Sequence, residues 1–541
     1  MPRNDTVQII DCDVLVIGSG IAGLRAALEV SRGGRDALLV SKSPVGKANN
    51  TYLAGGLFSV AHGGFDADTH MQKTIESGRG LSNRVLVSKF ITEAPHMIEE
   101  LRALGMKGRF HPTGFATRES SLLGGPQINA VLLRACRQGG VRFIEETIVA
   151  DLLVRDRTCF GAIGFHKRTG DVYGFRAGAV MLAAGGAGAV YAQHDNAPGI
   201  TGDGYALCLD AGLELIDMEF VQFYSMVYAG SGKARMIIPA LFADAGAIVN
   251  RLGEDLKEKY SLHEKPVALV SRDRLTQALF KEIRQGNDLD GALLLDLTKV
   301  EDEQLPAEED ARKRLKRILS YDTRPVRIAP ACHFTMGGVI IDEWGGTAIG
   351  SLFAAGEVVG GIHGANRMGG NALSEALVFG TLGARRAVDT LGSRQSLKDF
   401  ERLAQEHGHR SLRARWRKGA RASGPGPLME NLRQSLWQDA GIVRDAESLK
   451  SALQVIDEVL GEVGKGGAGT PRELLRILEC RNAALAARSI VLGAIAREET
   501  RGSHFRSDFP AEDGRWVKNI HVGLDRGRPE ITRILPVPSL A

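Results

Sequence analysis

The chain has few of the features that mark membrane or nucleic-acid-binding proteins. Aromatic residues make up only 6% of its 541 residues, and its formal net charge is +4. Because no stripe of basic and aromatic residues stands out, we expect no nucleic-acid partner. No apolar run approaches the roughly 18 residues of a membrane-spanning helix, so we expect no direct membrane insertion. The length and composition describe a globular protein of two or three domains.

The cysteines also exclude several kinds of site. The six cysteines are Cys12, Cys136, Cys159, Cys208, Cys332 and Cys480, and no two of them form a C-x-x-C pair. We therefore expect no iron–sulfur cluster, structural zinc or other metal in this chain. Few cysteines and an N-terminus without the layout of a signal peptide favour a cytoplasmic protein. Any membrane association would have to come through a partner subunit.

Glycine, in contrast, is abundant, and its first cluster forms a dinucleotide fingerprint. Residues 13–40 predict a strand, a turn, a helix and a second strand, with Gly18-x-Gly20-x-x-Gly23 in the turn. In such a unit the first glycine makes the tight turn, the second admits a pyrophosphate and the third lets helix and strand pack. The alternative is a glycine-rich turn without a ligand. The candidate cofactor-binding residues here are Gly18, Gly20, Ala22 and Gly23, followed by Ser41 and Lys42, which replace the usual ribose-binding acid.

Further segments extend the predicted cofactor site. They are the polar loop 47–56, the buried strand that ends near Gly185, the TGDG sequence at 201–204 and the strand 350–357. We expect Thr201 to cap the helix that follows TGDG and Glu357 to bind a ribityl or ribose hydroxyl. Several such separated segments favour FAD over NAD. The candidate residues are Asn50, Gly55, Gly56, Ala184, Gly185, Asp203 and Glu357.

The stretch Ile362–Ser374, IHGANRMGGNALS, predicts the substrate end of the site. Arg367 can bind a carboxylate through two parallel hydrogen bonds. We expect its glycines to let the backbone approach a flat ligand, and the helix that begins at Asn371 to offer free N–H groups to an anion or a carbonyl. The glycines are Gly364, Gly369 and Gly370, and the candidate cofactor residues are Asn371, Ala372 and Leu373.

Motifs along the whole chain share one order. They are GSGIAGLRAA, AAGGAG, TGDGYAL, MEFVQF (218–223), SRD (271–273), CHFTMGG (332–338), GEVVGGIHGANRMGGNAL (356–373) and REETRGSHFRSDFP (497–510). Through them the chain resembles the flavoprotein subunits of the succinate dehydrogenase/fumarate reductase family, which includes L-aspartate oxidase and adenylylsulfate reductase.

The resemblance implies an α/β fold. A Rossmann-like FAD-binding domain would comprise residues 1–216 and 331–395, with an α+β capping domain at 217–330 and a C-terminal helical domain at 396–541. It also implies an FAD-dependent oxidoreductase that interconverts a C=C and a CH–CH bond next to a carboxylate. An iron–sulfur electron-transfer subunit is the expected partner, because this chain carries no cluster motif.

The resemblance further assigns roles at the site. It places Arg272 in proton transfer and His333 with Arg367 on the carboxylate of a small substrate. The alternatives are an ion pair of Arg272 with Asp273 at a helix start, and a core histidine at position 333. The residues Arg501, Gly502, His504 and Arg506 match a family motif, but we expect them to form interdomain salt bridges. The basic stretch 409–421 is either a solvated helix face or a docking face for an acidic partner.

Several positions depart from the family pattern. Asn49 stands where many members attach FAD through a histidine, and neither Asn49 nor Asn50 can make that bond, so we expect noncovalent FAD. Tyr224, Ser225 and Met226 replace the family's histidine, proline and threonine. The family's threonine–glutamate pair falls on Ile238 and Pro239, and an arginine of its proton relay falls on Phe242.

These departures affect one end of the substrate. A pocket lined by Tyr224, Met226, Ile238 and Phe242 would favour an apolar group over a second carboxylate, because a buried unpaired charge is costly. Tyr224 therefore joins the candidate catalytic residues, and Asp244 is a candidate replacement for the lost proton relay. The candidate substrates are then fumarate and an enoate that carries a larger apolar group. The alternatives are an L-aspartate oxidase and a flavin-bearing electron-transfer protein of a complex, without its own substrate.

Overall fold

The large sheet of the molecule is built around the first strand. The computed structural model describes residues 7–117, 124–230, 236–305, 309–392, 394–408, 412, 415–416 and 424–537. In the sheet, β1 (Gln8–Ile17) lies parallel to β2 (Ala37–Val40) on one side and to β9 (Val172–Leu182) on the other. The turn after β1 leads into α1 (Ile21–Arg32). The order predicted for residues 13–40 is confirmed.

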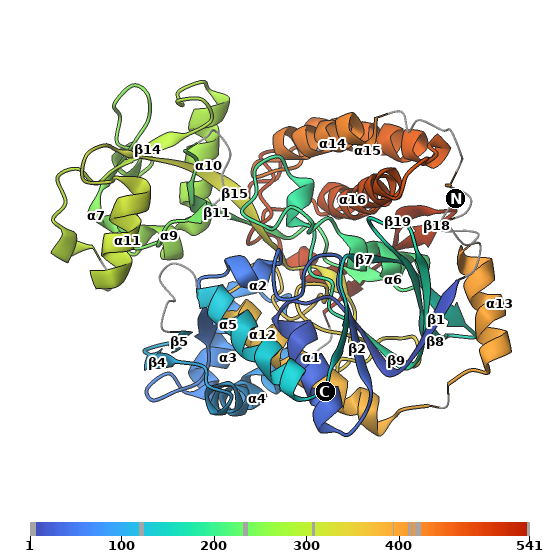
Figure 1. Ribbon diagram of the computed structural model, residues 1–541. Helices are drawn as coiled ribbons and strands as arrows, with labels where there is room; N and C mark the ends of the chain where they lie inside the picture. Colours follow the sequence, from blue (N-terminus) through green and yellow to red (C-terminus); the bar gives the residue numbers. More distant parts are fainter. Residues whose placement is uncertain are drawn as a thin grey trace.

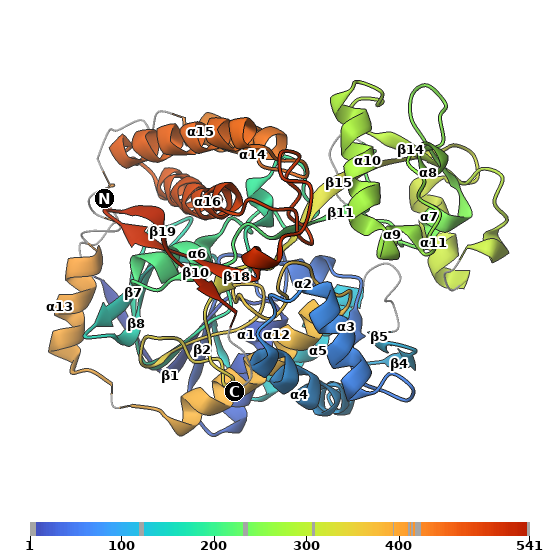
Figure 2. The same ribbon diagram turned by 180° about the vertical axis from the view of Figure 1, so that it is seen from behind.

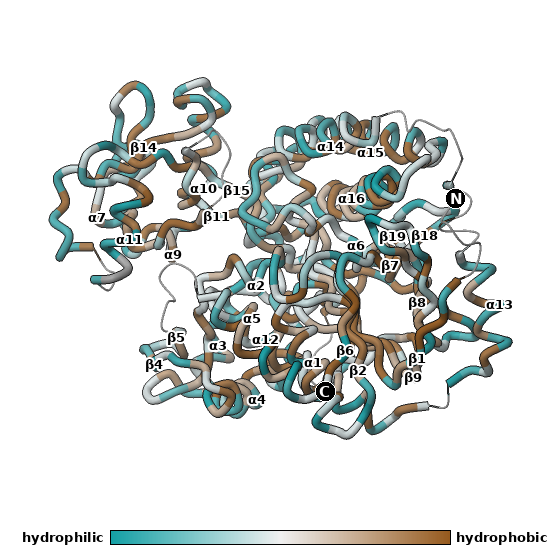
Figure 3. Tube along the Cα trace, viewed as in Figure 1, coloured by the Kyte–Doolittle hydropathy of each residue, from teal (hydrophilic) through white to brown (hydrophobic). Residues whose placement is uncertain are grey.

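Further strands complete this sheet. The strand order in this sheet is β6-β2-β1-β9-β8-β7, and β17 also pairs with β9. Helix α1 packs on the hydrophobic strands of this sheet and also contacts α5 and α12 (Figures 1 and 3). Two regions far apart in the sequence, 7–182 and 352–389, thus form one core. The bounds are β6 (Arg142–Ile144), β7 (Thr147–Arg155), β8 (Thr158–His166), β17 (Leu352–Ala354), α5 (Gly124–Gln138) and α12 (Asn371–Asp389).

A small antiparallel sheet and two helices flank this core. The sheet has the order β3-β5-β4, and α3 packs on α4, which contacts α12. The short helix α2 contacts α5. The bounds are α2 (Asn50–Leu53), β3 (Leu57–Ser59), α3 (Ala67–Ser77), α4 (Arg84–Ala103), β4 (Gly108–His111) and β5 (Gly114–Thr117).

The capping domain stands beside this body and is joined to it by two long strands (Figure 1). These are β11 (Val221–Tyr228) and β15 (Val326–Thr335), which pair antiparallel in the cap sheet β12-β11-β15-β14-β13. The cap has its own hydrophobic core. Its other elements are β12 (Met236–Ile237), α7 (Phe242–Ala245), β13 (Ala247–Val249), α8 (Leu256–Lys259), α9 (Val267–Val270), α10 (Arg272–Arg284), β14 (Leu293–Asp296) and α11 (Glu309–Leu319).

The C-terminal region forms a helical domain, with two strands that the sequence analysis did not predict. The helices α14, α15 and α16 pack on one another (Figure 2), and α16 contacts α6. The strands β18 and β19 extend a sheet of order β16-β10-β18-β19. The bounds are α6 (Asp203–Asp210), β10 (Leu215–Ile216), β16 (Gly338–Val339), α14 (Pro425–Asp439), α15 (Ala446–Lys465), α16 (Pro471–Ala496), β18 (Lys518–Asp525) and β19 (Arg528–Pro536).

One helix of the predicted C-terminal segment packs elsewhere. The helix α13 (Leu397–Gly408) contacts β7, β8 and β9 of the large sheet. His407 on this helix lies 2.9 Å from the carboxylate of Asp151 on β7. Most of the basic stretch 409–421 lies outside the described residues. Within the described ranges, no helix combines the length and apolar character that crossing a membrane requires.

A buried ionic cluster joins the end of α16 to the start of the cap. The guanidinium of Arg497 lies 2.7 Å from Glu219, and both side chains are fully buried. Arg501 pairs with Glu499 at 2.7 Å, and Nη1 of Arg444 lies 2.8 Å from Nδ1 of His504. Two further members of the predicted interdomain set are Arg506, which pairs with Asp508, and Gly502, which packs against Ala365. The contacts of these residues are structural.

Candidate functional site

The turn between β1 and α1 shows which glycines the fold itself requires. Gly18 has φ +112°, and a Cβ there would overlap the carbonyl oxygen of Ala183. A Cβ on Gly23 would overlap the carbonyl of Gly18. Gly20 differs, because its φ is −75° and a Cβ would meet only Thr51 Oγ1, at 3.3 Å. Close approach by a ligand is the physical reason that remains for glycine at this position.

The candidate residues that follow β2, Ser41 and Lys42, link this strand to the turn before α1 and to two helices. Ser41 Oγ lies 2.9 Å from Ser19 Oγ, at the turn. The Lys42 ammonium pairs with Asp203 at 2.6 Å and with Glu479 at 2.9 Å. Burial lowers the pKa of Lys42, but the two carboxylates outweigh it and raise that pKa above its ordinary value. The structure thus brings Lys42 and Asp203 together with a residue of α16.

Two details of the predicted cofactor loops are corrected. The N-cap of α6 is Gly202, with φ +84° and no side-chain cap, so Thr201 does not cap this helix. Asn49 caps α2 instead, because its Oδ1 accepts a hydrogen bond from the N–H of Tyr52 at 2.9 Å. Gly56 adopts φ +84° against Thr117 and Gly124. Gly55, Ala184 and Gly185 are half-buried, and Ala22 lies fully inside the contact between α1 and α12.

Asn50 and Glu357 meet at the inner end of the cofactor region. Nδ2 of Asn50 donates to Oε2 of Glu357 at 2.9 Å and to Oδ1 of Asn196 at 2.6 Å. The backbone N–H of Thr335 donates to Oε1 of Glu357 at 3.2 Å. Burial raises the pKa of Glu357, although these hydrogen bonds favour its ionised form. A half-buried acid with polar neighbours suits a hydroxyl-bearing cofactor.

The glycines of Ile362–Ser374 serve different purposes, which corrects the prediction that all three admit a flat ligand. Gly364 has φ +57° and packs on the backbone of Gly78, and Gly370 has φ +85° and packs on Ser59. Only at Gly369, of these three, does an added Cβ meet no heavy atom within 4 Å. Gly364 and Gly370 are therefore explained by their own turns and packing.

Asn371 begins α12, as predicted, but its side chain faces the protein. It is fully buried and bonded to Nε2 of His70 at 2.9 Å and to Thr74 at 3.0 Å. Ala372 and Leu373 are half-buried beside it. The first turn of α12 is thus fixed by side-chain contacts from α3, and its backbone remains the group that a cofactor could meet.

Two arginines converge where the cap meets the body. Nη2 of Arg272, the first residue of α10, donates to Oδ1 of Asn366 at 3.1 Å and to the carbonyl of Arg367 at 3.3 Å. Nη2 of Arg367 donates to Oε1 of Gln222 at 2.8 Å. The Nε atoms of both arginines are buried and have no hydrogen-bond partner among the described residues. Asp273 lies 4.0 Å from Nε of Arg272, the ion pair weighed as an alternative.

The positive charges of Arg272 and Arg367 favour the binding of an anion. Burial, together with the charge of Arg272, lowers the pKa of Arg367 to about 10. The guanidinium of Arg367 also lies 4.6 Å over the ring of Phe334. Neighbouring cations with unused donors are stabilised by a bound carboxylate, which accepts two parallel hydrogen bonds from a guanidinium.

His333 lies on β15 beside an acidic residue that the sequence analysis missed. Its Nδ1 is 2.7 Å from Oδ2 of Asp195, whose side chain is only 4% exposed, while that of His333 is 24% exposed. The ring of Tyr224 lies 5.6 Å from the imidazole. His333 is therefore no satisfied core histidine. Its polar neighbour follows AAGGAG in the sequence but belongs to no motif that could have marked it.

The predicted apolar pocket is largely wrong. Met226, Ile238 and Phe242 are completely buried in the hydrophobic core of the cap. Of the four predicted lining residues, only Tyr224 reaches the site, and its hydroxyl donates to the carbonyl of Ile238 at 3.1 Å. Asp244 accepts a hydrogen bond from the N–H of Val267 at 3.0 Å and shows no bond to Arg272.

Behind the arginines lies a second buried pair. His363 Nε2 is 4.0 Å from Glu375, and both side chains are almost fully buried. Burial, with the charge of Arg367, lowers the pKa of His363 to about 3, and burial raises the pKa of Glu375 to about 8. Both groups are therefore neutral near pH 7, and they add no charge to the arginine site.

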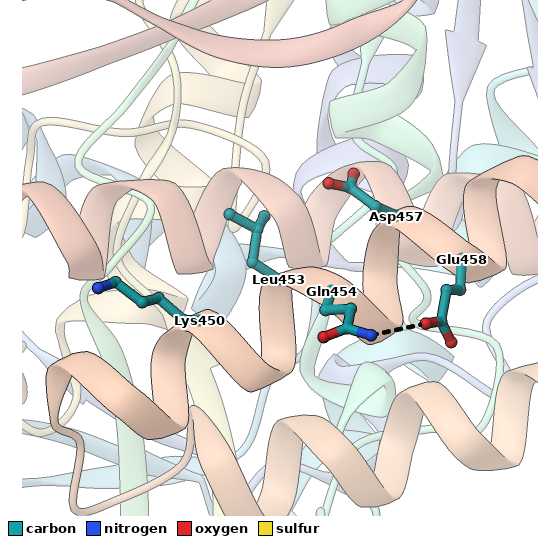
Figure 4. A pocket seen from close by; sticks show the side chains of 5 residues that line it. All are labelled: Lys450, Leu453, Gln454, Asp457 and Glu458. Carbon is teal, nitrogen blue, oxygen red and sulfur yellow. Dashed lines mark hydrogen bonds between the residues drawn. The ribbon is translucent and has the colours of Figure 1, made fainter.

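The hollows on the surface lie elsewhere. The one in Figure 4 is lined by Lys450, Leu453, Gln454, Asp457 and Glu458 of α15. A second, more apolar hollow lies between α4 and the strands β18 and β19. Neither contains a candidate residue, so the site is defined by its side chains and not by these hollows.

Known proteins match this arrangement over the whole chain. Residues 13–373 match the family model of an FAD binding domain, and residues 429–534 match that of the fumarate reductase flavoprotein C-terminus. The chain is 34% identical to one subunit of the CoM/CoB fumarate reductase of Methanothermobacter marburgensis, over 95% of this chain and 97% of the relative. The chain belongs to the fumarate reductase/succinate dehydrogenase flavoprotein family. As such it is an FAD-dependent oxidoreductase that acts on a CH–CH bond.

Solved structures of this flavoprotein family show the same fold. The E. coli quinol fumarate reductase FrdA superposes with a TM-score of 0.88 at 25% identity, covering 99% of this chain and 98% of that one. Sdh1 of Mycobacterium smegmatis gives a TM-score of 0.83 at 27% identity, over 98% and 95% of the two chains. L-aspartate oxidase of Streptomyces coelicolor is 30% identical over 96% of this chain and 92% of its own length.

Proposed function

We propose that this flavoprotein binds FAD noncovalently and interconverts a C=C and a CH–CH bond beside a single carboxylate. The observation that supports this most directly is the buried guanidinium of Arg367, whose Nε has no partner among the described residues and lies beside a second cation, Arg272. Arg367 has no ion pair among the described residues, and keeping its cation buried beside Arg272 costs stability, which a carboxylate ligand restores. A flavin protein without its own substrate would have no physical reason to retain them.

Each of the three polar residues has a proposed role. Arg367 and His333 hold the carboxylate and stabilise the charge that develops as the bond polarises. Arg272, fixed by Asn366, exchanges a proton with the carbon next to the carboxylate, where the negative charge develops. When bound, FAD supplies the hydride exchange with the carbon farther from the carboxylate. Gly20 and the Asn50–Glu357 pair would hold the cofactor.

Arg272 needs a group that returns its proton. The carboxyl group of Asp273 lies 4.0 Å from its Nε and accepts a hydrogen bond from Nδ2 of Asn366 at 3.0 Å. Burial raises the pKa of Asp273 above its ordinary value, and its side chain keeps 34% exposure to solvent. We therefore assign this role to Asp273 in place of Asp244.

The substrate class follows from the other side of the site. The positions that the family resemblance assigns to a second carboxylate carry Tyr224 and Ile238, and Ile238 is buried in the cap core. Neither position supplies a cation, so a substrate with one carboxylate and an apolar substituent is favoured over fumarate or aspartate, because an unpaired buried charge is costly. The names of the relatives favour fumarate and L-aspartate, and both are therefore tested beside apolar enoates.

Noncovalent FAD is supported by Asn49 and Asn50. An amide cannot form the covalent bond that a histidine makes with a flavin. Both side chains already form hydrogen bonds with other protein groups. Denaturation in acid should therefore release all of the yellow colour into the supernatant. Colour that remains with the precipitated chain would contradict this part of the proposal.

The electron partner is proposed to be an iron–sulfur protein. The Methanothermobacter relative is itself named as one of the subunits of its enzyme. We place this chain in the cytoplasm, with any contact to a membrane made by that partner. Co-expression with a neighbouring iron–sulfur protein, followed by co-purification of flavin and cluster absorbance, would test the assignment.

The main experiment is anaerobic reoxidation of the reduced flavin. Fumarate and crotonate-like apolar enoates are added in turn to the reduced enzyme, L-aspartate is added separately to the oxidised enzyme, and the flavin band is followed. We expect an apolar enoate to reoxidise the wild type, and the Arg367→Ala variant to lose about 100-fold or more of that rate. Arg385→Ala, which removes a surface ion pair with Glu29 on the same polypeptide, is the matched control.

The outcomes separate the rival functions. Rapid reoxidation by fumarate would overturn the single-carboxylate proposal, and reduction of the oxidised flavin by L-aspartate would favour an L-aspartate oxidase. No response to any enoate would support the electron-transfer alternative. An unchanged rate in Arg367→Ala would exclude the carboxylate role of this arginine.

A further inference from the structure

The contact between His333 and Asp195 is the polar feature of the site that its proposed function has not used. Oδ2 of Asp195 is 2.7 Å from Nδ1 of the imidazole. Its other oxygen, Oδ1, accepts a hydrogen bond from Nδ2 of Asn196 at 3.0 Å. Both oxygens of a nearly buried carboxylate are thus engaged, and one of them is committed to His333.

The backbone holds this contact rigidly. The segment 193–196 runs beside β15 as an added bridge, with His194 opposite Cys332. The N–H of Asp195 donates to the carbonyl of Cys332 at 3.2 Å, and the N–H of Cys332 donates to the carbonyl of Gln193 at 2.9 Å. The segment that carries Asp195 is therefore held by two backbone hydrogen bonds to Cys332, the residue that precedes His333.

Side chains extend this support to the cofactor region. Nδ2 of Asn196 also donates to the carbonyl of His333 at 3.0 Å. Oδ1 of Asn196 accepts from Asn50 at 2.6 Å, and Asn50 in turn donates to Glu357 at 2.9 Å. A continuous hydrogen-bonded chain therefore links the proposed FAD residues to the imidazole.

The orientation of the imidazole follows from donor and acceptor chemistry. An ionised carboxylate can only accept hydrogen bonds, so the proton of this contact is on Nδ1 of His333. The second nitrogen, Nε2, shows no partner in the part of the chain that the structure describes, and the side chain is partly exposed. In a neutral ring Nε2 is then an acceptor, which repels a carboxylate. Only the imidazolium carries a second N–H.

We propose that Asp195 is a positioning residue that keeps the proton on Nδ1 of His333, so that Nε2 binds the substrate carboxylate only when the ring is an imidazolium. This inference rests on the proposed function. It makes substrate binding, and not the chemical step alone, sensitive to pH.

Other charged and titratable groups surround the ring. Glu357 is close enough for the charge of His333 to act on it, and Tyr224 faces the ring. Two arginines are also near. Burial raises the pKa of Tyr224, and the charge of Arg272 partly offsets this rise. Burial lowers the pKa of Arg367, and the charge of Asp195 partly offsets this fall. The arginines oppose an imidazolium and the carboxylates of Asp195 and Glu357 favour it. Asp195 is the group in hydrogen-bond contact with the ring.

The sign of the pH effect follows directly. As pH rises and the imidazolium loses its proton, Nε2 becomes an acceptor and KM for the enoate rises, by up to about tenfold per pH unit. The value of kcat at saturating substrate changes less, because any bound complex contains the protonated ring. A purely structural role of Asp195 would change stability without this split between KM and kcat.

The decisive variant is Asp195→Asn. Asn196 donates to Oδ1 of residue 195, so the carbonyl oxygen of the new amide faces Asn196 and its NH₂ group faces Nδ1. The ring then carries its proton on Nε2 while neutral, and it offers a donor to the carboxylate at every pH. We expect KM of the holoenzyme to become independent of pH between about pH 6 and 9. At low pH it is about tenfold above wild type, since one charged hydrogen bond is lost.

A matched control exists in the same chain. Asp151 and His407 form a similar pair, 2.9 Å apart with side chains 5% and 14% exposed, on β7 and α13. The Asp151→Asn variant should keep the wild-type pH profile of KM. A wild-type profile in Asp195→Asn, or a flat profile in the wild type, would overturn the proposal.

A second measurement needs no substrate. Holoenzyme with ¹⁵N-labelled histidine, compared with a His333→Gln variant to assign the signal, reports which ring nitrogen carries the proton. We expect Nδ1 in the wild type at high pH and Nε2 in Asp195→Asn. Protonation of Nε2 in the neutral wild-type ring would refute the inference even if no substrate is found. If the tautomers are as expected but no enoate is turned over, the proposed function is wrong and the assignment of the ring proton is not.

Discussion

Gly20 offers a direct test of the cofactor site, because its replacement separates ligand binding from folding. Its φ of −75° suits any residue, and an added Cβ would meet one heavy atom, Thr51 Oγ1, at 3.3 Å. This hydroxyl already accepts a hydrogen bond from the N–H of Ile21 at 3.0 Å, so it can shift by only a few tenths of an ångström. The substitution Gly20→Ala should therefore disturb the apoprotein little.

The effects on folding and on FAD binding differ in size. The contact with Thr51 costs on the order of 1 kcal/mol, and the lower entropy of the unfolded alanine variant offsets about 0.4–1 kcal/mol of it. We expect the apoprotein to change by less than about 1 kcal/mol. FAD, in contrast, loses close approach to the backbone at the start of α1, where one hydrogen bond to a charged phosphate contributes about 1.5–3 kcal/mol. Its Kd should rise about 10- to 100-fold.

The assay measures both quantities on one preparation. Apoprotein stability is taken from urea unfolding after removal of FAD, and Kd from the quenching of flavin fluorescence on rebinding. A Gly20→Ala variant that binds FAD as tightly as the wild type would refute the placement of the pyrophosphate. A variant whose apoprotein fails to fold would show instead that Gly20 is needed by the fold.

Three further changes have expected outcomes. Gly23→Ala should destabilise apoprotein and holoprotein alike by about 1–3 kcal/mol in urea, because its Cβ overlaps backbone of Gly18 that cannot move aside. Arg497→Met should cost about 3–5 kcal/mol by leaving Glu219 buried and unpaired, and the added change Glu219→Gln should recover part of this loss. Glu375 has a folded-state pKa raised to about 8 by burial, so stability should fall as pH rises from about 5 to 8, where the unfolded chain releases this proton first. Glu375→Gln should remove at most about 4 kcal/mol of that fall, measured by denaturation at several pH values, and an unchanged pH dependence would contradict the assignment.

The fingerprint of the FAD-binding domain was predictable because its physics is local. Gly18 and Gly23 are demanded by a turn and a helix–strand contact within a few residues, and these leave a fixed spacing in the sequence. The same holds for the start of α12 at Asn371. Family motifs then supplied the positions of Arg272, His333 and Arg367, which the structure places around Asn366 and β15.

The missed features depend on contacts between distant segments. Asp195 reaches His333 across 138 residues, and nothing in its own neighbourhood marks it. The apolar pocket was wrong for a similar reason, since an apolar residue at a substituted family position can face either a ligand or a core. The pairing register of β11 decides this for Met226, and that register is a property of the folded cap.

The two arginines of the site belong to different bodies. Arg272 begins the cap helix α10, whereas Arg367 lies in the loop before α12 and is fixed to the FAD-binding domain. Arg272 contacts this loop through hydrogen bonds to the side chain of Asn366 and the carbonyl of Arg367. If the proposed function is correct, moving the cap away from the FAD-binding domain would separate Arg272 from Arg367. A carboxylate bound to both guanidinium groups would then hold the two bodies together.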